Sequence, residues 1–162
     1  MTMELLLLSN STLPGESFFQ WPRTYVASFL KGRKRLAFVP FAATEDQLDA
    51  YVERVTPIFG EMGCEVMSLH REQDPARTLS GCDAVAVGGG NSFLLLRTLY
   101  RTGLIRAMAN RVKDGLPYLG WSAGSNVACP TIMTTYDMPI VEPPSLKAMH
   151  LVPFQIYPHY TE

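Results

Sequence analysis

The sequence predicts an α/β protein with a mostly parallel sheet and helices on both faces, in three layers. Short, continuously apolar runs alternate along the chain with longer segments of helical periodicity. Continuous apolar runs are typical of strands covered on both sides, as in a parallel sheet. The strand–helix alternation predicts right-handed crossovers between parallel strands. Two glycine-rich turns directly follow two of the apolar runs, and in such sheets ligands bind at the carboxyl ends of strands.

Five strands and four helices follow from the pattern of apolar residues. The expected strands are residues 3–8, 36–42, 65–69, 83–87 and 116–121. The expected helices are residues 18–30, 45–61, 93–100 and 105–113. The second helix is the most regular, because apolar residues recur on one face from Leu48 to Phe59 and Thr44 stands at the capping position. Residues 130–162 hold half of the prolines and no glycine, which predicts loop, edge strand or irregular cover.

Length and composition narrow the class of protein. The 162 residues predict a single domain, residues 1–162, and the net charge of -1 gives no electrostatic case for nucleic acid or an anionic membrane as partner. The three cysteines, Cys64, Cys82 and Cys129, are far apart, which argues against a disulfide framework or a zinc site and for a reducing compartment. The first apolar run is too short for a signal peptide or a membrane span. We therefore expect a cytoplasmic protein.

The sharpest local motif is G-x-S-x-G at residues 120–124. It follows an expected strand and precedes a short helix-like stretch, which is the context of a nucleophile elbow. Such a turn lifts the hydroxyl of Ser122 above the sheet. The amide of Ala123 would lie at a helix N-terminus, where it can bind a developing oxyanion. The alternative is a glycine-rich turn with an incidental serine.

A second glycine-rich turn, residues 88–92, follows the expected strand 83–87. Its spacing does not fit the dinucleotide fingerprint, because Phe93 stands where the third glycine would be, and it lacks the Gly-Lys-Ser/Thr of a phosphate loop. One interpretation is a second wall of the same site, which gives an amide to the oxyanion and Asn91 to the substrate. The other is a helix-capping turn, with Asn91 or Ser92 as the cap.

A serine nucleophile needs a base and a group that orients the base. His159 is favoured over the other two histidines, because it follows the nucleophile and lies in a proline-stiffened segment. Asp137 is a better orienting candidate than Glu142. The order Ser122, Asp137, His159 is that of α/β-hydrolases, but the spacing leaves no room for the elements that normally separate them, so an ordinary esterase is disfavoured.

Several blocks of sequence together match one known family. MELLLLSNSTLPG, FVPFA, VGGGNSF, LGWSAGSNVACPTI, TTYDMPIV and PFQIYPHYTE occur in the family's order. On these blocks the chain resembles the peptidase E family, bacterial α-aspartyl dipeptidases that are serine peptidases related in fold to class I glutamine amidotransferases. The resemblance implies hydrolysis of Asp-X dipeptides with a free N-terminal aspartate, so that small peptides are the substrates, and it implies no metal or cofactor.

The resemblance also implies a role for each matching residue. It makes Ser122 the nucleophile, His159 the general base and Asp137 the charge-relay acid, with the amides of Gly90 and Ala123 as the oxyanion hole and Asn91 in the substrate-binding loop. Family members continue past the histidine, with further strands and a second acidic residue proposed as the triad member. The chain is therefore expected to lack the family's C-terminal portion.

The sequence is also compatible with two other functions. One is a truncated, catalytically impaired α/β module that binds a ligand or partner. The other is a peptidase or amidase of the same fold with different specificity, for example for aspartyl polymers.

Overall fold

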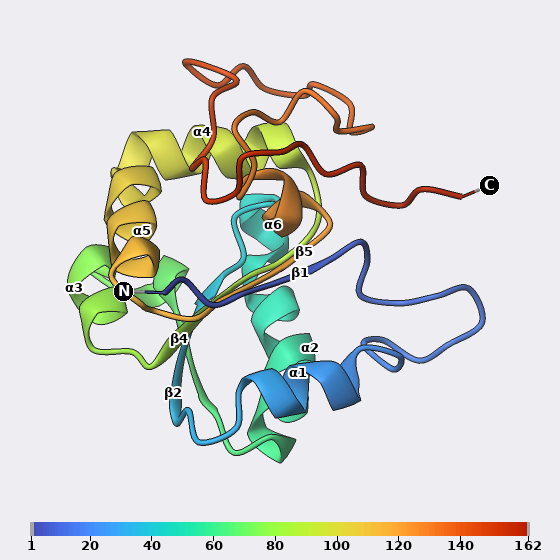
Figure 1. Ribbon diagram of the computed structural model, residues 1–162, viewed down its shortest axis with the longest axis vertical. Helices are drawn as coiled ribbons and strands as arrows, with labels where there is room; N and C mark the ends of the chain where they lie inside the picture. Colours follow the sequence, from blue (N-terminus) through green and yellow to red (C-terminus); the bar gives the residue numbers. More distant parts are fainter. Residues whose placement is uncertain (1, 162) are drawn as a thin grey trace.

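The computed structural model describes residues 2–161, which form a five-stranded parallel sheet (Figure 1). The strand order is β1-β5-β4-β2-β3, and every pair of neighbours is parallel. This confirms the predicted fold class. The strands are β1 (Leu5–Leu8), β2 (Arg35–Val39), β3 (Glu65–Ser68), β4 (Ala84–Val87) and β5 (Tyr118–Trp121).

Within residues 2–161, six α-helices and two short 3-10 turns surround the sheet. The helices are α1 (Arg23–Phe29), α2 (Leu48–Glu61), α3 (Pro75–Ser80), α4 (Ser92–Thr102), α5 (Leu104–Lys113) and α6 (Ala123–Asn126). The 3-10 turns are η1 (Glu45–Gln47) and η2 (Leu69–Arg71). Gly103, which lies in the gap between the expected helices 93–100 and 105–113, separates α4 from α5 with a left-handed φ of 74°.

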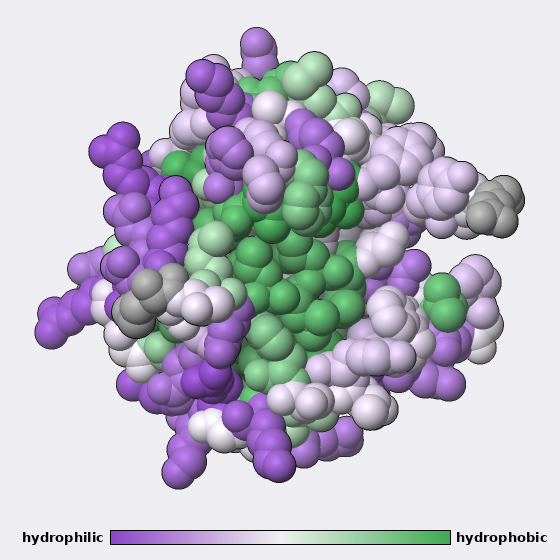
Figure 2. Space-filling view, viewed as in Figure 1, coloured by the Kyte–Doolittle hydropathy of each residue, from purple (hydrophilic) through white to green (hydrophobic). Residues whose placement is uncertain are grey.

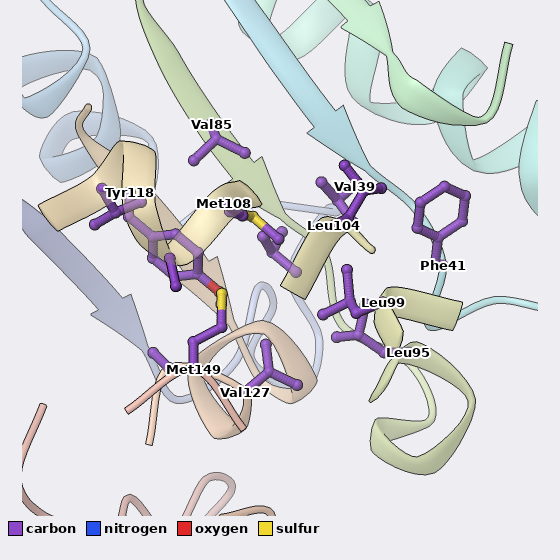
Figure 3. Packing of buried hydrophobic residues seen from close by; sticks show 14 of the residues in the cluster. Val39, Phe41, Val85, Leu95, Leu99, Leu104, Met108, Tyr118, Val127 and Met149 are labelled. Carbon is purple, nitrogen blue, oxygen red and sulfur yellow. The ribbon is translucent and has the colours of Figure 1, made fainter. Parts of the chain in front are cut away.

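Strand residues alternate between two apolar clusters, one on each face of the sheet. In β2, Ala37 and Val39 belong to one cluster, while Leu36 and Phe38 belong to the other. The first cluster packs against α4 and α5, and Figure 3 shows Val39, Val85 and Tyr118 pointing into it beside Leu99 and Met108. The second cluster packs against α1 and α2. The molecule therefore has the three layers that the apolar runs predict.

The structure differs from the sequence prediction in several details. Phe19 has a φ of 61°, which is not helical, so α1 begins only after Pro22. The second strand ends at Val39, before a proline that cannot donate to the ladder. The unpredicted helix α3 begins at Pro75, and the side chain of Asp74 caps it by accepting a hydrogen bond from the Arg77 amide at 3.2 Å.

Beyond α6, the described chain crosses the sheet's carboxyl edge as irregular structure. Residues 127–161 contain no helix or strand, apart from the isolated bridge between Thr131 and Lys147. Backbone hydrogen bonds nevertheless attach this segment to the end of α6: the amides of Met149 and Leu151 donate to the carbonyls of Val127 and Ala128 at 2.9 and 2.8 Å. This is the irregular cover that the proline content predicts.

One face of the molecule exposes an apolar area over the edge strand β1 (Figure 2). Leu5, Leu6 and Leu7 are only partly buried there, since no strand pairs with the outer side of β1 among the described residues. No helix within residues 2–161 has the length and apolar character needed to cross a lipid bilayer.

Candidate functional site

The strand order brings the loops that follow β1, β5 and β4 side by side at the carboxyl edge. Ser122 stands in the middle one, directly after β5 and before α6. Its φ of 55° and ψ of -111° are unusual for a residue with a side chain. Its carbonyl accepts the amides of Ser125 and Asn126 at 3.0 and 3.1 Å and so starts the helix. This is the sharp, strained strand-to-helix turn of a nucleophile elbow.

The two glycines of the motif are required by close packing. A Cβ at Gly120 would lie 2.6 Å from the Gly124 carbonyl oxygen, and a Cβ at Gly124 would overlap the carbonyl of Val87 at the end of β4. The hydroxyl of Tyr118 donates to the Gly124 carbonyl at 2.6 Å, and burial raises the pKa of this tyrosine. The elbow is thus held rigidly against two neighbouring strands.

The triple-glycine turn after β4 lies against the elbow. A Cβ at Gly89 would be 3.0 Å from the Cβ of Ser122. Gly90 has a φ of 144°, and a Cβ there would lie 2.5 Å from the Ala42 carbonyl oxygen. The hydroxyl of Tyr51 holds the turn from the other side by donating to the Gly89 carbonyl at 3.0 Å. Only a turn without side chains fits between the serine and the loop after β2.

Two backbone amides beside the serine are available to a ligand. Within residues 2–161, neither the Gly90 amide nor the Ala123 amide donates a hydrogen bond. Both belong to the turns that flank Ser122, and Ala123 is the first residue of α6. Free amides next to a nucleophile are what an oxyanion hole requires.

His159 is brought to the serine by the irregular C-terminal segment. Its Nε2 lies 2.6 Å from the Ser122 Oγ, and its own amide donates to the Ser9 Oγ, just after β1, at 2.7 Å. Two side chains, Asn126 and Thr134, donate to the Ile156 carbonyl three residues earlier. The two residues expected to act as nucleophile and base are therefore in hydrogen-bond contact.

Asp137 lines the same cleft but does not hydrogen-bond to His159. Its Oδ2 accepts the amide and the hydroxyl of Ser92, each at 2.7 Å, at the start of α4. The hydroxyl of Thr135 extends this network to Ser92 at 3.1 Å. Within the described chain, no side chain hydrogen-bonds to the Nδ1 of His159. The structure thus places the expected orienting acid near the pair without the expected contact.

The side chain of Asn91 caps helix α4, and the substrate contact that the resemblance implies for this residue stays a prediction. Its Oδ1 accepts the amides of Phe93 and Leu94, both at 3.1 Å, and its Nδ2 donates to the Met138 carbonyl at 2.8 Å. It does not line the cleft that contains Ser122. Its side chain fastens α4 to the segment that carries Asp137, which is the capping interpretation left open by the sequence.

The cleft around the serine has a volume of about 590 Å³. Figure 2 shows the surface hollowed between the C-terminal segment and the loop after β1. Besides the residues already named, the walls include Asn10, Thr12, Glu16, Phe18, Arg54 and Trp121. Arg54 is the only lysine or arginine among these lining residues, and no motif in the sequence marks it as part of a site. Across residues 2–161, no group of three or more His, Cys, Asp or Glu side chains is placed to hold a metal ion.

A second Ser-His-Asp chain of hydrogen bonds lies away from this cleft. His70 Nδ1 is 2.6 Å from Ser68 Oγ, and its Nε2 is 2.9 Å from Asp49 Oδ1. Ser68 is only 4% exposed, at the end of β3, so a substrate cannot reach its hydroxyl. Hydrogen bonds from His70 and Arg71 lower the pKa of Asp49, which keeps it charged. This cluster fastens α2 to β3 and has no exposed nucleophile.

The cysteines lie in the protein interior, where burial raises the pKa of each thiol. Cys129 is fully buried, and its Sγ donates to the Ser125 carbonyl at 3.4 Å. Cys64 and Cys82 are also buried and free. A protonated, inaccessible thiol is a poor nucleophile, which leaves Ser122 as the exposed candidate in the cleft.

Comparison with known proteins agrees with this geometry. The sequence model of the family described as "Peptidase family S51" matches residues 5–162 of the chain. Peptidase E of Salmonella typhimurium is 46% identical over 159 residues, which cover 98% of this chain and 69% of that protein. Peptidase E of Streptomyces coelicolor is 51% identical over 160 residues, which cover 99% of this chain and 65% of that protein.

Solved structures share the fold. A crystal structure assigned as a peptidase E protein from Listeria monocytogenes EGD-e superposes with a TM-score of 0.79 at 29% identity, over 98% of this chain and 80% of that one. A peptidase from an acI-B1 actinobacterium gives a TM-score of 0.72 at 18% identity, over 97% of this chain and 68% of that one. At that identity, the second match shows the fold alone.

Proposed function

Since the chain belongs to peptidase family S51, we propose that it is a serine-type dipeptidase that hydrolyses Asp-X dipeptides through an acyl-enzyme on Ser122. The observation that carries the proposal is the 2.6 Å contact between Ser122 Oγ and His159 Nε2 beside two free amides. A nucleophile, a base and oxyanion donors within one cleft are the parts that acyl transfer needs. The Asp-X preference comes from the family resemblance.

In the first half of the proposed reaction, His159 takes the proton of the Ser122 hydroxyl as the oxygen attacks the α-carbonyl carbon of the N-terminal aspartate. The carbonyl oxygen gains negative charge, which the amides of Gly90 and Ala123 bind. One such donor contributes about 10²–10³ in rate. The imidazolium then gives its proton to the leaving amine, and the C–N bond breaks to leave an ester on the serine.

In the second half, His159 takes a proton from a water molecule as the water oxygen attacks the ester carbon. The imidazolium then returns this proton to the Ser122 oxygen as the ester C–O bond breaks, which releases free aspartate and restores the enzyme. Asp137 enters this proposal as a negative charge on the cleft wall, opposite in sign to the charge that develops in the transition state on the ring of His159. It acts across the cleft, because its own hydrogen bonds go to Ser92. The three free cysteines support the cytoplasm as the compartment of this peptidase.

The proposal is tested by a substrate panel on the purified 162-residue protein. Asp-Leu should be hydrolysed, with Ala-Leu and Glu-Leu much slower. Hydrolysis of longer aspartyl peptides without turnover of any Asp dipeptide would favour the same-fold peptidase of different specificity. An absence of turnover on the whole panel would favour the impaired module.

A further inference from the structure

The wall of the cleft that faces α2 carries one positive charge, on Arg54. The side chain is exposed, and its guanidinium carbon lies 4.0 Å from the centroid of the Phe18 ring. This cation–π contact orients the guanidinium plane over the loop that follows β1. The guanidinium N–H groups point outward in the plane of the group, whereas the Phe18 ring contacts its face. The contact therefore leaves the N–H donors of Arg54 free to bind another group.

Arg54 has no counter-ion within residues 2–161. The ion pairs there join Arg23 to Glu61, Arg33 to Glu4, and both His70 and Arg71 to Asp49. The two acids that line the cleft are occupied elsewhere: Glu16 accepts the amide of Leu13 at 2.9 Å, and Asp137 accepts from Ser92. Arg54 is therefore not ion-paired with either acid among the described residues, and its guanidinium is open to a carboxylate that enters the cleft.

Arg54 also stands next to the backbone that would hold the reacting carbonyl. It lines the Ser122 cleft and an adjoining hollow, and both are bordered by Gly89 and Gly90. Tyr51, one turn earlier on α2, donates directly to the Gly89 carbonyl. A substrate whose carbonyl oxygen is bound at Gly90 therefore has Arg54 on the neighbouring wall.

We propose that Arg54 is the specificity-determining residue that binds the side-chain carboxylate of the N-terminal aspartate. This inference rests on the proposed function. An aspartate carboxylate is separated from its own carbonyl carbon by only two carbons, and a planar guanidinium matches a carboxylate with two parallel hydrogen bonds. The neutral asparagine side chain has the same shape but lacks the charge.

The test compares Arg54→Met and Arg54→Lys with the unchanged protein on Asp-Leu and on the isostere Asn-Leu. Arg54→Met should lower kcat/KM for Asp-Leu about 10- to 100-fold and should remove most of the preference over Asn-Leu, because charged hydrogen bonds are lost. Arg54→Lys should keep part of the preference, since it keeps the charge but loses the fork. Arg106→Met, an exposed arginine on α5 outside the cleft, is the matched control and should change neither value.

Two further comparisons are needed. One distinguishes the side-chain carboxylate of the substrate from its C-terminal carboxylate, and the other distinguishes failure of the Arg54 assignment from failure of the proposed function. If Arg54→Met changes the ratio between Asp-Leu and its C-terminal amide but not the ratio to Asn-Leu, Arg54 binds the terminal carboxylate and the side-chain assignment is wrong. If Asp-Leu is hydrolysed with its preference intact in Arg54→Met, the inference fails while the proposed function stands. If the unchanged protein hydrolyses no Asp dipeptide, calorimetry with free L-aspartate and L-alanine decides: the inference requires aspartate binding that Arg54→Met abolishes.

Discussion

Gly124 packs so closely on Val87 that a Cβ added to the glycine would overlap the valine's carbonyl oxygen. This contact joins the first turn of α6 to the end of β4, and it fixes the elbow relative to the triple-glycine turn. The distance between Ser122 and the amides proposed as its oxyanion donors therefore depends on backbone packing more than on side chains. Mutations in this packing should affect folding and catalysis together.

Gly124→Ala should reduce the free energy of unfolding by about 2 kcal/mol or more, because the overlapping atom is rigid backbone and the strand must shift. Gly60→Ala is the matched control. Gly60 lies in α2 with no atom within 4 Å of an added Cβ, so alanine there should be neutral or stabilising by about 0.5–1 kcal/mol. Urea unfolding of both variants measures the difference. Equal stability of the two would contradict the close packing at the elbow.

Ser92→Ala should lower the free energy of unfolding by about 1.5–3 kcal/mol, since it removes a buried hydroxyl that donates to the charged Asp137. Asp137→Asn should weaken the same network and also lower kcat, because the fixed negative charge is lost. The comparison of the two variants separates structure from catalysis. If Ser92→Ala reduces kcat as much as Asp137→Asn does, Asp137 acts only as a structural anchor.

Stability should fall in acid partly through Asp83. Hydrogen bonds from the backbone amides of Arg35 and Lys34, both at 2.9 Å, lower its pKa in the folded protein. Because the folded pKa lies below the unfolded value of about 3.9, the contribution is present above that pH and is lost as the pH falls through the folded pKa. Asp83→Asn should flatten the acid limb of a urea-midpoint profile between about pH 5 and pH 2. If the acid limb of the profile is the same in Asp83→Asn as in the unchanged protein, the Asp83 carboxylate contributes nothing to the free energy of unfolding.

Much of the fold was predictable because apolar runs and glycine turns are local signals. The five strands and the breaks at Gly103 and Ser122 were found in this way. The start of α1 was not, since a left-handed φ at Phe19 leaves no mark in an otherwise helical pattern. Helix α3 has only six residues and a single cap, so it carries too little periodicity to be recognised.

The site was predictable only as far as its motifs reach. Ser122 and the glycine turns can be recognised from local sequence motifs. His159 was preferred among the three histidines because of its position in the chain. The partner of Asp137 is Ser92, 45 residues away, and only the packing of the irregular segment on α4 decides that contact. Arg54 is a single cation on an amphipathic helix, and its place in the cleft depends on the order of the strands and on the loop that carries Phe18.

His159→Ala should lower kcat/KM by about 10³-fold or more, because it removes the proposed base. The side chain is exposed, so the unfolding midpoint should not change. His150→Ala, at another exposed histidine with a positive φ and no place in the cleft, serves as the control and should retain activity. The base assigned here would be wrong if the two variants were equally active.

The central claim is that Ser122 Oγ, 2.6 Å from His159 Nε2, attacks the peptide carbonyl. The most direct measurement is the rate of Asp-Leu hydrolysis by Ser122→Ala beside the unchanged protein, with circular dichroism to verify the fold. We expect this rate to fall by about 10⁴-fold or more with the fold intact. Hydrolysis at an undiminished rate by a correctly folded Ser122→Ala protein would contradict it.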